Sequence, residues 1–261
     1  MKKRSSWLLV FSVLFCLALL VFVGAYYALH PAGVSYLKWR FAGGDIDGLR
    51  QLCLSGQLDR EQVIDLAGSG ASLQVRMAAL QCFTEKERFE RPYSQDVVKA
   101  IAAFAKRPPF EAPEIDAWGT MLCYVMVSSP QDEFFPIIEG LAASEDPMIR
   151  SFAGAAFLVA YDYGEKGRLL LMKLLKDPIP MVRLNAMVGI AGVAQESEEK
   201  ASDLLDQMRS SILDSATEEP RLRAGALRIL WRHHRITRQE VEAFQKDRQP
   251  DVAQEAQKLL Q

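Results

Sequence analysis

The chain has few of the residues from which most catalytic and metal sites are built. Its 261 residues include three histidines and four cysteines, and none of these lies at the spacing of a zinc site. His233 and His234 are neighbours, so on a helix they diverge by about 100° and cannot bind one ion together. Neither a Gly-x-Ser-x-Gly turn nor a His-Glu-x-x-His helix occurs. We therefore expect no catalytic residue, no metal and no cofactor, and a protein that is not an enzyme.

The four cysteines are far apart in the sequence. Cys16 lies in a long apolar segment, and Cys53, Cys82 and Cys123 follow without the spacing of metal ligands. In an oxidising compartment, Cys82 could pair with either Cys53 or Cys123. The alternative is that all three are small apolar core residues, since Cys82 and Cys123 fall on the apolar side of predicted helices. We favour the core interpretation.

Asparagine is almost absent, and the charges nearly cancel. Asn185 is followed by Ala-Met, so the sequence has no N-glycosylation acceptor. The chain carries 31 basic and 33 acidic residues, a net charge of −2. Without the three basic residues at positions 2–4, 28 basic residues remain against 33 acidic ones, which is about −5. Because a nucleic-acid-binding domain is expected to present a basic face, we expect no nucleic acid partner.

Charge is missing altogether from residues 7–29, a run of 23 residues. As a helix this segment is about 34 Å long, enough to cross a hydrocarbon core of ~30 Å. Three basic residues precede it, which predicts that residues 1–6 are cytoplasmic and that the chain beyond the membrane is extracytoplasmic, in the periplasm of a bacterium. Residues 30–44 then form a juxtamembrane linker. The alternative is a signal peptide cleaved near Ala25, which would release a secreted protein.

The rest of the chain repeats one pattern six times. The copies open at Leu73 and then at five prolines: Pro113, Pro147, Pro180, Pro220 and Pro250. Two residues later each copy has a branched aliphatic residue: Val75, Ile115, Ile149, Val182, Leu222 and Val252. Six residues later it has a small one: Ala79, Gly119, Ala153, Ala186, Ala226 and Ala256. Ten residues later it has an apolar one: Phe83, Cys123, Phe157, Ile190, Leu230 and Leu260. Successive copies are 30 to 40 residues apart, a period typical of helical solenoids.

These positions predict one helix in every copy. They are four residues apart and therefore lie along one helix face, and proline suits the first helical turn because its missing N–H has no partner there in any case. A second apolar helix is expected after each of the first five, over residues 96–106, 133–143, 167–176, 201–213 and 238–246. Two short helices, 46–54 and 60–66, precede the first copy. Stacked helix pairs would bury one continuous core.

Three copies carry a longer motif. They read Asp-Pro-Met-Ile-Arg-Ser-Phe-Ala from Asp146, Asp-Pro-Ile-Pro-Met-Val-Arg-Leu-Asn-Ala from Asp177 and Glu-Pro-Arg-Leu-Arg-Ala-Gly-Ala from Glu219. This motif resembles the HEAT-like repeat, in the short form also seen in phycobilin lyase subunits, over roughly residues 72–261. The resemblance implies an all-α, right-handed α-α superhelix.

In that family, the arginine after the branched aliphatic residue helps to tie successive repeats together. Here it falls on Arg76, Arg150, Arg183 and Arg223, whereas Asp116 and Ala253 stand in its place in the other two copies. The whole repeat domain is predicted to span residues 45–261. Within it we expect an N-terminal cap or divergent repeat at 45–71, repeats at 72–111, 112–145, 146–176, 177–216 and 217–247, and a C-terminal half repeat at 248–261.

A solenoid of this kind offers an extended binding groove. By resemblance, the second helices at 97–104, 134–141 and 169–175 would line it. We therefore expect a membrane-anchored scaffold or adaptor that binds proteins or peptides, with partners among membrane or envelope proteins. Two other functions stay open: an enzyme-associated subunit like the lyase subunits, and a self-associating structural envelope protein.

One local feature suggests a second contact surface. Four arginines recur at helical spacing in the fifth repeat: Arg221, Arg228, Arg232 and Arg235. We predict that this basic stripe binds an acidic partner protein or an anionic lipid headgroup. The alternative is a solvated face whose charges pair with nearby glutamates.

Overall fold

The computed structural model describes residues 46–69, 72–86, 92–157 and 163–261. All the regular secondary structure in these ranges is helical, which confirms the all-α prediction. The transmembrane segment expected at 7–29, its cleavage alternative near Ala25 and the linker at 30–44 lie outside the described residues. Among the helices that are described, none has the length and the hydrophobicity needed to cross a bilayer.

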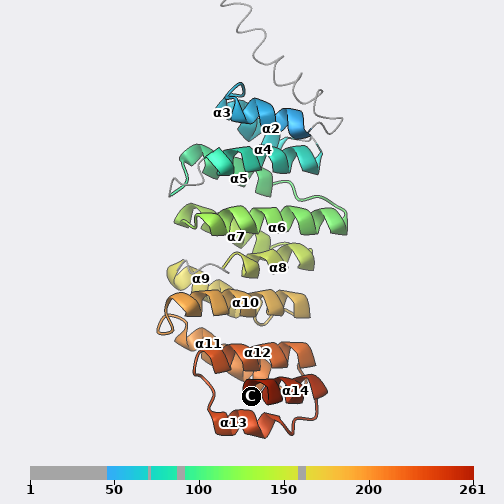
Figure 1. Cartoon of the computed structure of the whole chain (residues 1–261), viewed down its shortest axis with the longest axis vertical. Helices are drawn as coiled ribbons and strands as arrows, with labels where there is room; N and C mark the ends of the chain where they lie inside the picture. The colour runs from blue at the N-terminus through green and yellow to red at the C-terminus, as the bar shows by residue number, and fades with distance from the viewer. Residues whose placement is uncertain (1–45, 70–71, 87–91, 158–162) are drawn as a thin grey trace, which may run out of the picture.

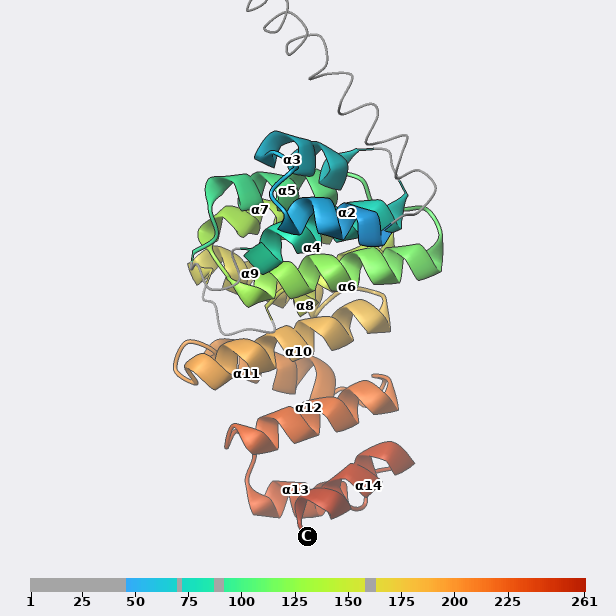
Figure 2. The same ribbon diagram turned by 45° about the horizontal axis from the view of Figure 1, so that its top comes forward.

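The helices form a stack of two layers (Figures 1 and 2). The first layer holds α2 (Ile46–Leu54), α4 (Leu73–Lys86), α6 (Ala112–Ser128), α8 (Pro147–Ala155), α10 (Pro180–Glu196), α12 (Pro220–Arg232) and α14 (Pro250–Leu259). The second layer holds α3 (Arg60–Gly68), α5 (Gln95–Ala105), α7 (Phe135–Ala142), α9 (Gly164–Leu174), α11 (Ser202–Met208) and α13 (Arg238–Phe244). Neighbours within a layer contact one another, as α8 does with α6 and α10, and the layers meet where α8 packs on α7. The chain therefore runs down the long axis of the molecule in order (Figure 1).

The prolines mark the helix starts as expected. Four of them are the first residue of a helix: Pro147, Pro180, Pro220 and Pro250. The residue before α8, Asp146, accepts hydrogen bonds from the backbone N–H groups of Met148 and Ile149, at 2.7 and 3.4 Å. Proline is tolerated in this first turn because its N–H would have no carbonyl partner within the helix.

The repeated apolar positions form the core. The branched aliphatic residue is buried in all six copies, and so is the small residue four positions later. At the third position of the pattern, Cys123 and Leu260 are only partly buried, whereas the other four residues are buried. The predicted helix face therefore coincides with the face that packs into the stack.

Small residues bring neighbouring first-layer helices into close contact. A Cβ added to Gly119 of α6 would lie 2.1 Å from the ring of Phe152 on α8. Between α8 and α10 the backbones themselves meet: a Cβ on Gly154 would lie 2.6 Å from the nitrogen of Ala186, and one on Gly189 would lie 2.5 Å from the carbonyl oxygen of Gly154. Any larger residue at these positions would push the helices apart.

The second-layer helices depart from the prediction in detail. The helix expected at 201–213 is α-helical only to Met208 and continues as one π-helical turn, η2 (Arg209–Leu213), closed by the bond from the Asp214 N–H to the Arg209 carbonyl. The helix expected at 133–143 opens with a 3-10 turn, η1 (Asp132–Phe134). Pro136 follows within the first turn of α7, where it cannot donate an N–H. Such local turns leave no periodic apolar signal in the sequence.

Candidate binding surfaces

The four arginines of the repeat pattern join successive helix pairs, and we call Arg76, Arg150, Arg183 and Arg223 the arginine clamp. Each extends from its first-layer helix back to the last turn of the preceding helix or to the connection between the two. The acceptors there are backbone carbonyls: Ala67 for Arg76, Ser144 and Glu145 for Arg150, Asp177 for Arg183 and Leu213 for Arg223. Ala67 and Leu213 belong to the last turn of the preceding helix, and the other three carbonyls lie between helices, so in every case the carbonyl needs a donor from outside a helix.

The clamp also extends forward, to the connection that leads into the next first-layer helix. Arg76 donates to the carbonyl of Phe104 at 2.8 Å, and its guanidinium lies 5.0 Å from the centre of the Phe104 ring. The other three arginines donate to carboxylates: Asp177 for Arg150, Glu218 for Arg183 and Asp247 for Arg223. The pair of Arg223 and Asp247 is bidentate, with bonds of 3.0 and 2.8 Å. The connection that contains Asp177 is therefore held from both sides, by Arg150 of α8 and by Arg183 of α10.

The clamp sets the charge state of its acceptors. Burial raises the pKa of Asp177, but the hydrogen bonds from Arg150 and from the backbone N–H of Ile179 outweigh it, so the pKa lies below its ordinary value. Asp247 behaves in the same way, with Arg223 as its main hydrogen-bond donor, and its pKa is also lowered. Both carboxylates are therefore charged at neutral pH and hold their arginines electrostatically.

The clamp is interrupted at α6. Asp116 takes the place of the arginine there and is exposed to solvent. The C-terminal end of α5 is still held from one side, because Arg76 and the indole of Trp118 both donate to the carbonyl of Phe104, the latter at 3.2 Å. Helix α6 itself contains no arginine, so no clamp residue extends from it to the next connection, 143–146. The other exception, Ala253, lies in α14, the last of the described helices.

An apolar groove of about 510 Å³ lies at this interruption, between α5 and α7. Its walls are Ala102 and Ala105 of α5, Pro108 of the connection, and Pro136, Ile137 and Gly140 of α7. Buried side chains form its floor: Trp118, Leu141 and Ile149. Among its described lining residues only Lys106 and Glu133 are charged. The groove therefore offers an apolar surface on second-layer helices, in part of the region that the resemblance predicted for binding.

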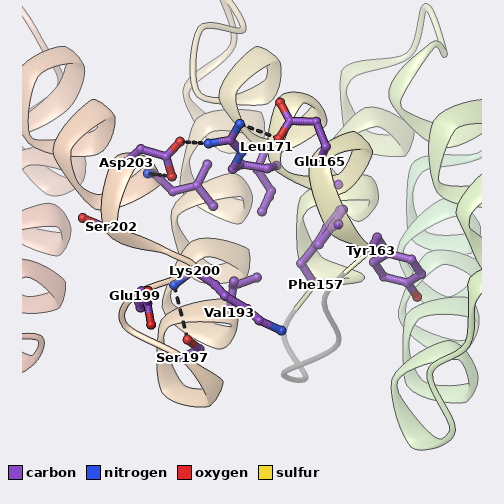
Figure 3. A pocket seen from close by; sticks show the side chains of 14 residues that line it. Phe157, Tyr163, Glu165, Leu171, Val193, Ser197, Glu199, Lys200, Ser202 and Asp203 are labelled. Atoms are coloured by element: carbon purple, nitrogen blue, oxygen red, sulfur yellow. Dashed lines mark hydrogen bonds and ion pairs between the residues drawn. The ribbon is translucent and has the colours of Figure 1, made fainter.

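A second, more polar cleft of about 650 Å³ lies between α9, α11 and the connection after α10 (Figure 3). Phe157, Leu171 and Val193 form its apolar side. Its charged rim is self-contained, since Arg168 pairs with both Glu165 and Asp203. Its described lining contains neither histidine nor cysteine, so no nucleophile–base pair of that type faces the cleft. The arrangement is that of a cross-link between helices rather than a set of groups directed at a ligand.

The basic stripe is partly neutralised. Arg228 forms a bidentate pair with Glu255 of α14, at 2.6 and 2.8 Å, and Arg235 lies 3.8 Å from Asp206. Arg221 and Arg232 are exposed and form no ion pair within the described part of the chain. The structure brings Arg221, Arg228 and Arg232 onto one face of α12, whereas Arg235 lies beyond the end of that helix. The charge that remains for a partner is therefore smaller than the sequence suggests.

The histidines lie in different environments. His233 is buried and lies 3.4 Å from Glu198, whereas His234 is exposed and takes a left-handed backbone conformation, with φ of 54°. His30 lies outside the described residues. Within the ranges that the structure describes, no cluster of three or more histidine, cysteine or acidic side chains could hold a metal ion.

The acidic partners of the clamp were not singled out from the sequence as binding residues. Asp177 and Asp247 lie three residues before a proline, and Glu218 lies two before one. An acidic residue at this offset from a helix start is the signal that could have identified them. The groove residues gave no such signal, because Ile137 and Pro108 come together only through the stacking of α5 on α7.

Comparison with known proteins adds no relative. No family model matches the chain, and no curated protein or solved structure is significantly similar to it. The likeness to HEAT-like repeats therefore depends on the residues of the chain alone.

Proposed function

We propose that the chain is a non-catalytic adaptor, anchored in a membrane through residues 7–29, whose HEAT-like right-handed superhelix binds an apolar segment of a partner protein. The observation that carries this proposal is the apolar groove between α5 and α7, which lies where the arginine clamp is interrupted. A ligand site is expected to be concave, mostly apolar and furnished with a few polar groups at its edge. The groove has these properties.

The lining residues indicate the chemistry of the partner. Pro108 and Ile137 offer rigid apolar contacts, and Lys106 and Glu133 at the rim can pair with polar groups that flank the apolar segment. A volume of about 510 Å³ accommodates a few side chains rather than a whole helix. A short apolar motif of a membrane or envelope protein fits this site. The anchor would raise the effective concentration of such partners near the groove.

The test is crosslinking in intact cells. A photoreactive amino acid replaces Ile137 in the groove, and a matched control replaces Tyr124, which is 62 % exposed on α6 in the first layer. We expect one reproducible adduct with a membrane-fraction protein from position 137 and none from position 124. The bait chain recovered in the adduct should be full length. A chain shortened near Ala25 would contradict the anchor, and equal adducts from both positions would contradict the groove.

Gly140 offers a way to fill the groove without disturbing the fold. A Cβ added there meets no atom within 4 Å, so Gly140→Phe introduces a ring into free space, and Gly140→Ala is its matched control. Both changes favour the α7 helix, since glycine is a poor helix former. The adduct at position 137 should disappear in Gly140→Phe and persist in Gly140→Ala. Adducts of equal yield in the two variants would overturn the proposed site.

The basic stripe is a second contact in this proposal. Arg221 and Arg232, which have no ion pair in the described structure, would bind acidic residues of the same partner. Arg221→Glu together with Arg232→Glu should weaken recovery of the partner while leaving the melting temperature unchanged. Full recovery of the partner by this double variant would remove the stripe from the interface.

A further inference from the structure

Two cysteines meet at the N-terminal end of the stack. Cys53 lies near the end of α2, Cys82 lies in α4, and the two helices pack against each other. Cys53 is the neighbour with the largest effect on Cys82, since a side-chain hydrogen bond with it is the main cause of the raised pKa of the Cys82 thiol. A neighbouring bond fixes the register of this contact, since Nη2 of Arg50 donates to Oε1 of Gln81 at 2.9 Å. The packing of α2 on α4 therefore makes neighbours of two side chains that are 29 residues apart in sequence.

The environment of the pair suits thiol–disulfide exchange. The hydrogen bond with Cys53, followed by burial, raises the pKa of Cys82, while the charge of Arg50 opposes this rise. Cys82 therefore remains protonated and can donate its hydrogen to a thiolate on Cys53. Cys53 is half-buried and Cys82 is 8 % exposed, so Cys53 is the sulfur that an external reagent meets first.

We propose that Cys53 and Cys82 form a disulfide bond that ties α2 to α4 when the chain meets a disulfide donor, either a thiol oxidoreductase or a small-molecule disulfide. The Cys53 thiolate attacks one sulfur of the donor, and the other donor sulfur leaves as a thiolate. Cys82 then loses its proton and attacks the Cys53 sulfur, which releases the second donor thiolate. The two cysteines lose two electrons and two protons, and the donor disulfide becomes two thiols.

The disulfide bond would attach the first described helix pair, α2 and α3, covalently to the rest of the stack. The loop that it closes contains all of α3, so both α2 and α3 would be held through a covalent link to α4. Terminal helices of a stack have a neighbour on one side only and open more readily than central ones. This inference does not depend on the groove or on the membrane anchor.

Cys123 provides an internal control. Its Sγ donates to the carbonyl of Phe152 at 3.4 Å, and burial raises its pKa to about 12. Its hydrogen-bond partner is a backbone carbonyl rather than a second thiol, so no neighbouring thiol is positioned to complete a disulfide with it. Cys123→Ser should leave the oxidation of the pair unchanged.

The first test uses the full-length chain in detergent without any substitution. The chain is incubated with a mixture of reduced and oxidised glutathione, denatured, alkylated and digested with trypsin. We expect a reducible species in which peptide 51–60, with Cys53, is joined to peptide 77–86, with Cys82. A persistent glutathione adduct on Cys53 with alkylated Cys82, or a bond from either residue to Cys123, would overturn the proposal.

The second test measures whether the disulfide bond slows the opening of α2 and α3. Hydrogen exchange of the amides in α2 and α3 should slow on oxidation, on the order of 100-fold for a closed loop of this length. Exchange in α12 and α14 should not change. The comparison is made between the oxidised and reduced forms of the same chain, so it does not require any variant to fold. Equal exchange rates of α2 in the two forms would refute this effect of the bond.

Discussion

Arg76 at the N-terminal end of the clamp and Arg223 near its C-terminal end occupy the same position of the repeat and are equally buried, each 6 % exposed. Both donate to a carbonyl in the last turn of the helix that precedes their own. They differ in the forward direction, where Arg76 meets the carbonyl and ring of Phe104 and Arg223 meets the carboxylate of Asp247. The clamp is therefore one geometric device with two electrostatic forms, neutral acceptors at one end and charged acceptors at the other.

The difference matters because buried charges need partners. The side chains of Arg223 and Asp247 are 8 % and 13 % exposed, so either one alone would be a poorly solvated charge. Loss of one partner from a buried pair typically costs more than loss of a donor from a neutral carbonyl. The C-terminal form of the clamp should therefore be more sensitive to mutation, to acid and to salt than the N-terminal form.

The largest expected effect comes from deleting each arginine. Arg223→Met should destabilise the C-terminal helices by about 3–5 kcal/mol, because Asp247 is left as an unpaired buried charge. Arg76→Met should destabilise its surroundings by about 1–3 kcal/mol, because only carbonyl groups lose a donor. Helix-resolved hydrogen exchange in urea measures both changes. Equal losses in the two variants would mean that the charge of the acceptor is immaterial.

A change of pH should separate the two forms without any mutation. Asp177, Asp247 and Glu255 all have pKa values below the ordinary 3.8 or 4.5. Their contribution to stability is complete above the ordinary pKa values of these groups and is lost as the pH falls through the lowered values.

The acceptors of Arg76 do not titrate, so α4 and α5 should keep their protection in this range. The lowered pKa of Asp96, on α5, belongs to a half-buried carboxylate whose partner Arg60 is exposed, so solvent screens this pair more than it screens the buried carboxylates. Hydrogen exchange between pH 5 and pH 3 should therefore show α12 and α14 opening first. If α4 opened together with them, the neutral clamp would offer no protection against acid.

The parts of this structure that the sequence predicts are those that depend on single residues. Proline at a helix start acts through its own ring and missing N–H, so the starts of α8, α10, α12 and α14 could be read directly. The buried small residues follow from one position in the repeat. These features need no knowledge of which other segment lies nearby.

Features that join distant segments could not be predicted in the same way. Arg223 and Asp247 are 24 residues apart, and Arg150 and Asp177 are 27 apart, so their pairing depends on how far each connection extends. The proximity of the Cys53 and Cys82 side chains depends on the register of α2 on α4, and the core interpretation of the cysteines did not anticipate it. The groove is lined by residues of α5, α6 and α7 and of the connections between them, so it appears only once these segments are placed.

An arginine placed at position 116, where the clamp is interrupted, should extend the comparison to the middle of the stack. In Asp116→Arg, the new guanidinium would extend from α6 toward the connection 143–146, which contains Glu145, and we expect a gain of about 1 kcal/mol. It should also narrow the groove, so the adduct from position 137 should weaken. Asp116→Ala removes the same negative charge without adding a donor and is the matched control. Identical unfolding curves and adduct yields for the two variants would show that the interruption does not create the groove.

The smallest expected difference concerns two ion pairs near the surface, one at each end of the stack. Arg228 is itself exposed, but its partner Glu255 has a side chain that is only 7 % exposed, and its pKa is lowered chiefly by the hydrogen bond from Arg228. Arg228→Gln should therefore destabilise α14 by about 1 kcal/mol or less, after allowance for solvent screening of the arginine. Arg60→Gln, which breaks the exposed pair with Asp96, should leave the unfolding curve of the N-terminal helices unchanged.

Raising the salt concentration should reduce the effect of Arg228→Gln only slightly, because one partner is buried. If the two variants lost stability equally, and salt removed both losses, then burial of the carboxylate would not distinguish the two ends of the stack.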